Sequence, residues 1–185
     1  MNTKKRVVVM GIVLLFLVCV LLIGFGMGNM RAKIAAYNFS KHVDSMDLSN
    51  LTLTIYYVNP SIFTLYPLGV DEVIDSCGEQ AIVVDGDTLE EHIDLLKQVK
   101  NAPLKPVWHK AYMNARIYYI FEAEGKGKIL DVVMWGEYED IDIDAGIIFV
   151  NGAKVKETDI FYEIIIPFLP DGVARELESY LSRAD

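Results

Sequence analysis

Alternating apolar and polar residues dominate the chain beyond residue 50 and predict short β-strands. The segment 51–58, LTLTIYYV, alternates leucine and isoleucine with threonine and ends at Asn59-Pro60. Further short strands are expected in IFTLYPL, AIVVDG, NARIYYIFEAE and KILDVVMW, and a turn at 125–127 joins the last two. The strongest hairpin is IIFV-NG-AKVKE, because Asn-Gly tolerates the positive φ that a type I′ turn requires at both central positions.

Between these strands, apolar residues spaced three and four apart predict helices. Residues 70–78 have this spacing and end in glycine, which predicts a short helix that buries Cys77. Thr88 and Glu91 match a capping box that opens LEEHIDLLKQVK, and Pro103 follows this helix.

Two more helices are expected near the C-terminal end of the sequence. Thr158 or Asp159 can cap the first, and Pro167 would kink or end it. The second starts at Pro170-Asp171. The residues expected to point inward are Ile160, Phe161, Ile164, Ile165, Phe168, Val173, Leu177, Tyr180 and Leu181.

Strands and helices in this order predict an α+β fold, an antiparallel sheet with helices packed on one face. The sequences TIYYV … AIVVDG … TLEEHIDLL and RIYYIF … IIFVNG … TDIFYEIII follow a similar order and predict an internal duplication. On this hypothesis a pseudo-symmetry of the sheet relates residues 55–58 to residues 117–120.

The start of the sequence has a different character. Lys4-Lys5-Arg6 precedes an uncharged run from Val7 to Gly28, which as a helix would span about 33 Å and cross a hydrocarbon layer of ~30 Å. This length predicts an N-terminal transmembrane helix retained as a signal anchor, because the apolar part of a cleaved signal peptide is normally roughly 7–15 residues. Cleavage stays open as the alternative. The basic residues before the run favour an N-terminus inside the cell membrane and a C-terminal domain outside.

The predicted organisation therefore has four parts. They are a cytoplasmic basic leader at 1–6, the transmembrane helix at 7–28, a stalk or linker at 29–50 and the extracytoplasmic domain at 51–185. The first part of the stalk is compatible with a helix, whose loose apolar stripe consists of Ile34, Tyr37, Val43 and Met46.

Charge and cysteine usage limit the partners and the chemistry. Three of the 17 basic residues lie in the leader, so 14 remain against 26 acidic residues, a net charge of about −12. Such a surface repels nucleic acid and anionic lipid, so no nucleic-acid partner is expected. Cys77 is the only cysteine outside the predicted span, so no intrachain disulfide can form there. A buried thiol is predicted, with an interchain disulfide or a reactive thiol as the alternative.

No motif assigns a reaction. His42, His92 and His109 occur without a nucleophile elbow or metal-ligand spacing, so structural roles are expected for them. No catalytic, cofactor-binding or metal-binding residue is therefore assigned. Paired carboxylates could serve a glycosidase if a pair faced a cleft. The nominal pairs are Glu90/Glu91, Glu122/Glu124 and Glu137/Glu139.

Aromatic residues gather in the predicted strands and the adjoining loops. Those on an outer face of the sheet could form a platform for a cell-wall glycan or a peptide, and ordinary packing in the sheet is the alternative. They are Tyr56, Tyr57, Trp108, Tyr112, Tyr118, Tyr119, Trp135 and Tyr138.

The segment 139–146, EDIDIDAG, resembles the beginning of a calcium loop. An EF-hand is excluded, because the positions that require glycine and glutamate hold alanine and asparagine. Asp140, Asp142 and Asp144 are instead expected on the wet face of a strand, or in an acidic loop before a shorter strand at Ile147. A weak calcium site is a further alternative.

The predicted anchor is followed by LTLTIYYVNPSIFTLYPL, LEEHIDLLKQV, ARIYYIFE, DVVMWG and FVNGAKVKETDIFYEIIIPFLP. This combination resembles uncharacterised single-pass membrane proteins of Gram-positive gut bacteria with one exported small α+β domain, and the resemblance implies no activity. We expect a membrane-tethered extracytoplasmic binding or scaffolding module without catalysis, held by residues 7–28, with a cell-wall or protein ligand. The alternative is an extracytoplasmic carboxylate-dependent enzyme acting on cell-wall glycan.

Overall fold

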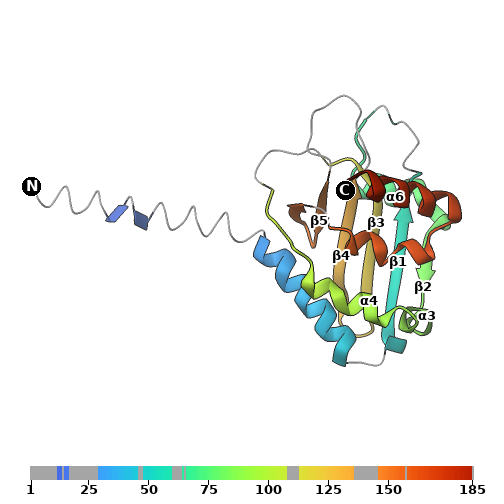
Figure 1. The fold of residues 1–185 in the computed structure, drawn as a ribbon, viewed down its shortest axis with the longest axis horizontal. Helices are drawn as coiled ribbons and strands as arrows, with labels where there is room; N and C mark the ends of the chain where they lie inside the picture. Colours follow the sequence, from blue (N-terminus) through green and yellow to red (C-terminus); the bar gives the residue numbers. More distant parts are fainter. Residues whose placement is uncertain are drawn as a thin grey trace, which may run out of the picture.

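The computed structural model describes residues 12–13, 15–16, 29–45, 48–59, 64, 66–107, 113–135, 146–156 and 158–184. Its centre is a six-stranded antiparallel sheet in the order β2-β1-β3-β4-β5-β6, with helices packed on it (Figure 1). The predicted α+β class is confirmed. The strands are β1 Leu51–Tyr57, β2 Ile82–Val84, β3 Ala115–Ala123, β4 Gly127–Trp135, β5 Ile147–Val150 and β6 Ala153–Lys156.

Most of the predicted strands are present, because their alternation matches a sheet with one fully buried face. In β1 the side chains of Leu51, Leu53 and Ile55 lie in the main core, while the intervening threonines are half-buried. The turn at 151–152 between β5 and β6 has positive φ at both residues, 47° and 73°, as predicted. IFTLYPL lies partly outside the described residues, and its described residues form no strand.

The predicted internal duplication does not match the order of the strands. β1 and β3 are neighbours, and Tyr56 lies opposite Tyr118 in their antiparallel register. β2 borders β1, but β5, its counterpart in the sequence repeat, is separated from β3 by β4. A local two-fold axis at the Tyr56–Tyr118 pair relates 55–57 to 117–119, but the strand order does not extend the repeat beyond this pair, so the duplication stays a prediction from the sequence. Beyond this pair, the shared preference of strands for aromatic and β-branched residues is enough to account for the similar sequences.

The helix at 29–45, which the sequence assigned to a stalk, packs into the core of the domain. The ring of Phe39 lies 4.7 Å from that of Phe121 in β3. Ile34 and Tyr37, two members of the predicted stripe, point away from the domain and are 52% and 58% exposed. Val43, a third member, is buried in the core, so the predicted stripe does not follow one face of the helix. Three alanines, which give a weak apolar signal, make up much of the buried face. The buried side chains are Ala32, Ala35, Ala36, Phe39 and Val43.

The predicted span at 7–28 lies outside the described residues except for Ile12, Val13, Leu15 and Phe16, which are exposed. Within the described part of the chain, no helix combines the length and the apolar character needed to cross a membrane. The anchor stays a prediction from the sequence.

Helices cover the two faces of the sheet unequally. The 29–45 helix, α3, α4, α5 and α6 pack on one face, and α2 packs on the other (Figure 1). The expectation that all helices share one face is therefore wrong for α2, where Val73 contacts the cluster of Tyr118 and Val133.

Cys77, the last residue of α2, is a buried free thiol as predicted. The remaining helical bounds are α2 Val70–Cys77, α3 Gly86–Glu90, α4 Ile93–Gln98, α5 Ile160–Glu163 and α6 Asp171–Ala184, with 3-10 turns η1 Leu48–Asn50, η2 Gly78–Gln80, η3 Val99–Asn101 and η4 Ile166–Phe168.

The helix predicted to start at Thr88 begins earlier, at Gly86, and continues as α4 after a break at 91–92. Asp85 is the N-cap, and its Oδ1 accepts a hydrogen bond from the Thr88 N–H at 3.0 Å. This hydrogen bond lowers the pKa of the Asp85 carboxyl. The sequence pattern predicted Thr88 as the N-cap residue. In the structure Asp85 is the N-cap, and the backbone N–H of Thr88 is the group that it caps.

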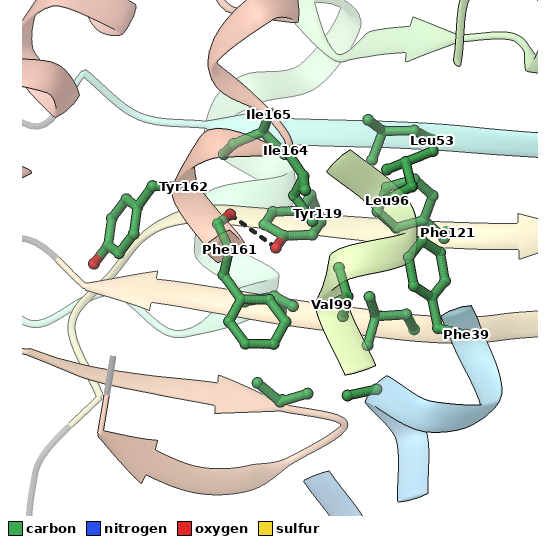
Figure 2. Close-up of a cluster of buried hydrophobic side chains, with 14 of the residues drawn as sticks. Phe39, Leu53, Leu96, Val99, Tyr119, Phe121, Phe161, Tyr162, Ile164 and Ile165 are labelled. Atoms are coloured by element: carbon green, nitrogen blue, oxygen red, sulfur yellow. Dashed lines mark hydrogen bonds between the residues drawn. The ribbon is translucent and has the colours of Figure 1, made fainter. Parts of the chain in front are cut away.

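Tyr119 occupies the centre of the main core (Figure 2). Its side chain is fully buried, and its hydroxyl donates a hydrogen bond to the backbone oxygen of Phe161 at 2.9 Å. Burial raises the pKa of the Tyr119 phenol well above its usual range, so the group stays protonated and remains a donor. This bond connects α5 to the middle of the sheet.

Candidate functional site

The residues singled out in the sequence are scattered over the fold. His92 is half-buried at the start of α4, where its ring meets Phe168 edge-on at 5.1 Å. His109 lies outside the described residues, as do Asp140, Asp142 and Asp144. β5 begins at Ile147, as the shorter-strand alternative expected. Of the acid pairs, Glu90/Glu91 and Glu122/Glu124 are exposed, and Glu137/Glu139 lies outside the described residues.

No group of three or more His, Cys, Asp or Glu side chains that could hold a metal ion occurs in the part of the chain that the structure describes. The weak calcium site considered above falls at 137–144, outside that part.

His42 lies in a basic groove between the 29–45 helix and the β3–β4 hairpin. The groove is open to solvent and has a volume of about 410 Å³. Three lysines and a histidine line it, and no Asp or Glu is among the described residues that do so. This composition differs from that of the whole chain, whose net charge is −9. The lining residues are Asn38, Lys41, His42, Ser45, Lys126, Lys128 and Ile129.

Buried contacts fix the helical wall of the groove. Phe39 packs against Phe121, and the next residue, Ser40, is fully buried. The Ser40 hydroxyl accepts a hydrogen bond from the Lys100 N–H at 2.9 Å and donates one to the Leu96 carbonyl at 3.4 Å. Asn38, Lys41, His42 and Ser45 are spaced three and four residues apart and therefore share one face of the helix. The buried contacts of Phe39 and Ser40 orient this polar face toward the groove.

The opposite wall is the tight turn between β3 and β4. Gly125 and Gly127 adopt positive φ of 72° and 70°, which side-chain-bearing residues rarely do. The Lys126 N–H donates to the Ala123 carbonyl at 3.0 Å. This turn brings Lys126 and Lys128 to the helix from a distant part of the sequence.

The electrostatics of the groove centre on His42. Its Nδ1 lies 3.4 Å from Nζ of Lys126. Partial burial, and then the charge of Lys126, lower the pKa of His42 below its usual range. A lysine ammonium can only donate, so Nδ1 accepts and the proton of the neutral imidazole is on Nε2. The groove thus combines cationic and neutral donors, which suit an anion.

Acidic partners of these lysines lie outside the lining. Asp131 pairs with Lys128 and raises the pKa of that lysine. On another side of the helix, Asp44 bridges Lys100 at 3.2 Å and Lys97 at 3.6 Å, and the hydrogen bond from Lys100 lowers the pKa of the Asp44 carboxyl. The Asp44 pairs are exposed and contribute little to stability. Asp131 is only 13% exposed, so its pair with Lys128 is less screened by solvent than the Asp44 pairs.

A second hollow of about 420 Å³ lies beside α5. It holds two carboxylates, Asp159 and Glu163, one helical turn apart and both exposed. The Oγ1 of Thr158, at the same hollow, is buried without a hydrogen-bond partner among the described residues. No histidine, cysteine or lysine lines this hollow among those residues. Its chemistry is that of a polar, acidic surface depression.

The aromatic side chains that the structure describes do not form one platform. Tyr56 and Tyr118 stack on the α2 face with ring centroids 6.0 Å apart. Tyr119 is buried on the opposite face, and Tyr57 is half-buried against the same core. Trp108, Tyr112 and Tyr138 lie outside the described residues.

No protein-family model, no curated protein and no solved structure matches this chain. The basic groove is the site that sequence inspection missed. The signal available in the sequence was weak: Lys41-His42 in one segment and Lys126 and Lys128 around a glycine turn in another. Nothing in the sequence shows that the two segments meet.

Proposed function

We propose that the protein is a membrane-tethered extracytoplasmic binding module without catalysis, whose folded domain binds an anionic group in the basic groove. The observation that carries this proposal is the lining of the groove, which contains Lys41, Lys126 and Lys128 together with His42. Lysine and neutral imidazole N–H groups favour phosphate, sulfate or carboxylate oxygens. An anionic cell-wall polymer or an acidic protein segment supplies such oxygens.

The tether supports this proposal from the sequence. The apolar run at 7–28 is long enough to cross a membrane, and the basic residues before it favour an outer location for the domain. A binding module needs only a rigid surface held in place. The 29–45 helix forms one wall of the groove and packs into the domain core, so this wall is part of the rigid domain.

The alternative is a carboxylate-dependent enzyme acting on cell-wall glycan, and the hollow beside α5 is the observation that favours it. Asp159 and Glu163 are the two carboxylates there. A glycosidase requires one of its two carboxyl groups to be held protonated at neutral pH, usually by burial. Both residues here are exposed, so the binding role has the stronger support.

The test is a titration of the full chain, in detergent micelles at low salt, with inositol hexasulfate, whose charge does not change near neutral pH. The variant Lys41→Gln/Lys126→Gln should weaken binding about tenfold or more, and the affinity of the wild type should fall as salt is added. Lys105→Gln/Lys156→Gln, which removes the same charge from exposed positions outside the groove, is the matched control. Equal losses in the two variants, or no binding by the wild type, would contradict the proposal.

A further inference from the structure

The 29–45 helix has an apolar side that the domain does not cover. Met30, Ile34 and Tyr37 are 59%, 52% and 58% exposed. Their spacing of four and three residues places them on one face of the helix. Phe39 and the alanines of the helix point the opposite way, into the core. The helix thus has two apolar faces, and the domain buries one.

Basic residues border the exposed stripe of Met30, Ile34 and Tyr37. At ~100° of rotation per residue, Arg31 lies on one flank of the stripe and Lys33 on the other, and both are exposed. No acidic residue precedes Asp44 in the sequence. An apolar stripe with basic flanks is typical of helices that lie in the headgroup layer of a membrane.

We propose that this stripe, with Arg31 and Lys33 beside it, contacts the surface of an anionic lipid bilayer. The inference rests on the anchor of the proposed function, because the predicted span ends at Gly28, directly before the helix. Tyr37 lies about 10 Å further along the helix than Met30, whereas the headgroup layer is about 5–8 Å deep on each side. The helix is therefore tilted toward the membrane plane, so that all three side chains reach lipid.

The sequence before the helix permits this tilt. Residues 24–28, GFGMG, contain three glycines, and glycine is the weakest helix former after proline. A change of direction before the 29–45 helix therefore costs less at 24–28 than earlier in the apolar run.

Charge favours a lipid surface over a second copy of the chain as the partner. Two parallel helices joined along the stripe would bring Arg31 and Lys33 of both copies together, and no acidic residue before Asp44 could offset them. Lipid phosphates supply the opposite charge. The rest of the outer part is acidic and is repelled by the same lipids, so the basic helix is the side that faces the membrane.

The experiment uses the full chain in vesicles of phosphatidylcholine alone or of equal parts phosphatidylcholine and phosphatidylglycerol. In a Cys19→Ser/Cys77→Ala background, a nitrobenzoxadiazole label is attached to Ile34→Cys, Tyr37→Cys or, as the control on the same helix, Ser45→Cys. We expect brominated lipids to quench the labels at 34 and 37 at least twofold more than the label at 45. Quenching should be stronger with phosphatidylglycerol, and Arg31→Gln/Lys33→Gln should remove that difference.

Resistance to an alkaline carbonate wash separates the two proposals. A chain released by the wash would overturn both the anchor and the lipid contact. A chain that resists the wash, but whose labels at 34 and 37 are quenched no more than the label at 45, would overturn the lipid contact alone. Disulfide cross-linking between Ile34→Cys residues of two unlabelled copies, without quenching, would identify the stripe as a self-association surface and also overturn it.

Discussion

The ammonium nitrogen of Lys126 lies 3.4 Å from Nδ1 of His42, although the two residues are 84 positions apart in the sequence. The lysine comes from the turn of a β-hairpin and the histidine from a helix on the edge of the core. Partial burial, and then the charge of this neighbour, lower the pKa of the imidazole and so favour the neutral form of His42. The pair makes the basic groove sensitive to pH.

Folding stability should fall on acidification through His42. Its pKa is lower in the folded state, so below about 6.5 the unfolded chain takes up the proton first and is favoured. The contribution is complete above the unfolded pKa and is lost as the pH falls toward the folded one. His42→Gln should therefore show a smaller drop in thermal midpoint between neutral pH and about pH 5. Superimposable pH profiles of wild type and variant would contradict this assignment.

Anion binding should strengthen over the same pH range. A bound polyanion favours the charged imidazole, so affinity for inositol hexasulfate should rise by up to roughly fivefold as the pH falls below about 6.5. His42→Gln should bind with a nearly constant affinity. Isothermal titration at matched ionic strength measures the difference, and a rise retained by His42→Gln would assign the effect to another group.

Gly86 is required where α3 meets η1. A Cβ at this position would lie 1.7 Å from the backbone oxygen of Leu48, and backbone cannot move aside as a side-chain end can. Gly86→Ala should therefore destabilise the domain by about 3 kcal/mol or more. Gly172→Ala in α6, where a Cβ meets nothing within 4 Å, should be neutral or stabilising by up to ~1 kcal/mol. Chemical denaturation of the two variants provides the comparison.

The 29–45 helix should behave as core and not as a stalk. Phe39→Ala removes a fully buried ring and should cost about 3–5 kcal/mol of unfolding free energy. Tyr37→Ala, on the opposite face of the same helix, should change it by no more than ~0.5 kcal/mol in detergent. Equal and small effects of the two substitutions would show that the helix folds apart from the domain.

The hydroxyl of Tyr119 should stabilise the attachment of α5. Tyr119→Phe leaves the Phe161 carbonyl without its donor and should cost about 1–3 kcal/mol, as expected for an unsatisfied buried acceptor. Hydrogen exchange of the α5 amides should accelerate in the variant. Unchanged exchange there would show that the bond does not hold α5 in place.

Local patterns in the sequence were enough for most elements and for two turns, at 125–127 and 151–152. The alternation in LTLTIYYV depends only on one strand having one buried face, and the Asn-Gly hairpin depends only on two adjacent residues. The cap of α3 was misassigned because Thr88 and Asp85 both have the chemistry of a cap, and the backbone path decides between them.

By itself, the sequence determined the α+β class, the boundaries of most strands and the apolar run that predicts an anchor, because each follows from the periodicity or composition of a short segment. Only the tertiary structure decided which face of the 29–45 helix is buried, that α2 lies on the other face of the sheet, and that His42 meets Lys126. These three features depend on contacts between segments far apart in the sequence. No local pattern encodes them, since the energy of such contacts comes from packing and charge in three dimensions.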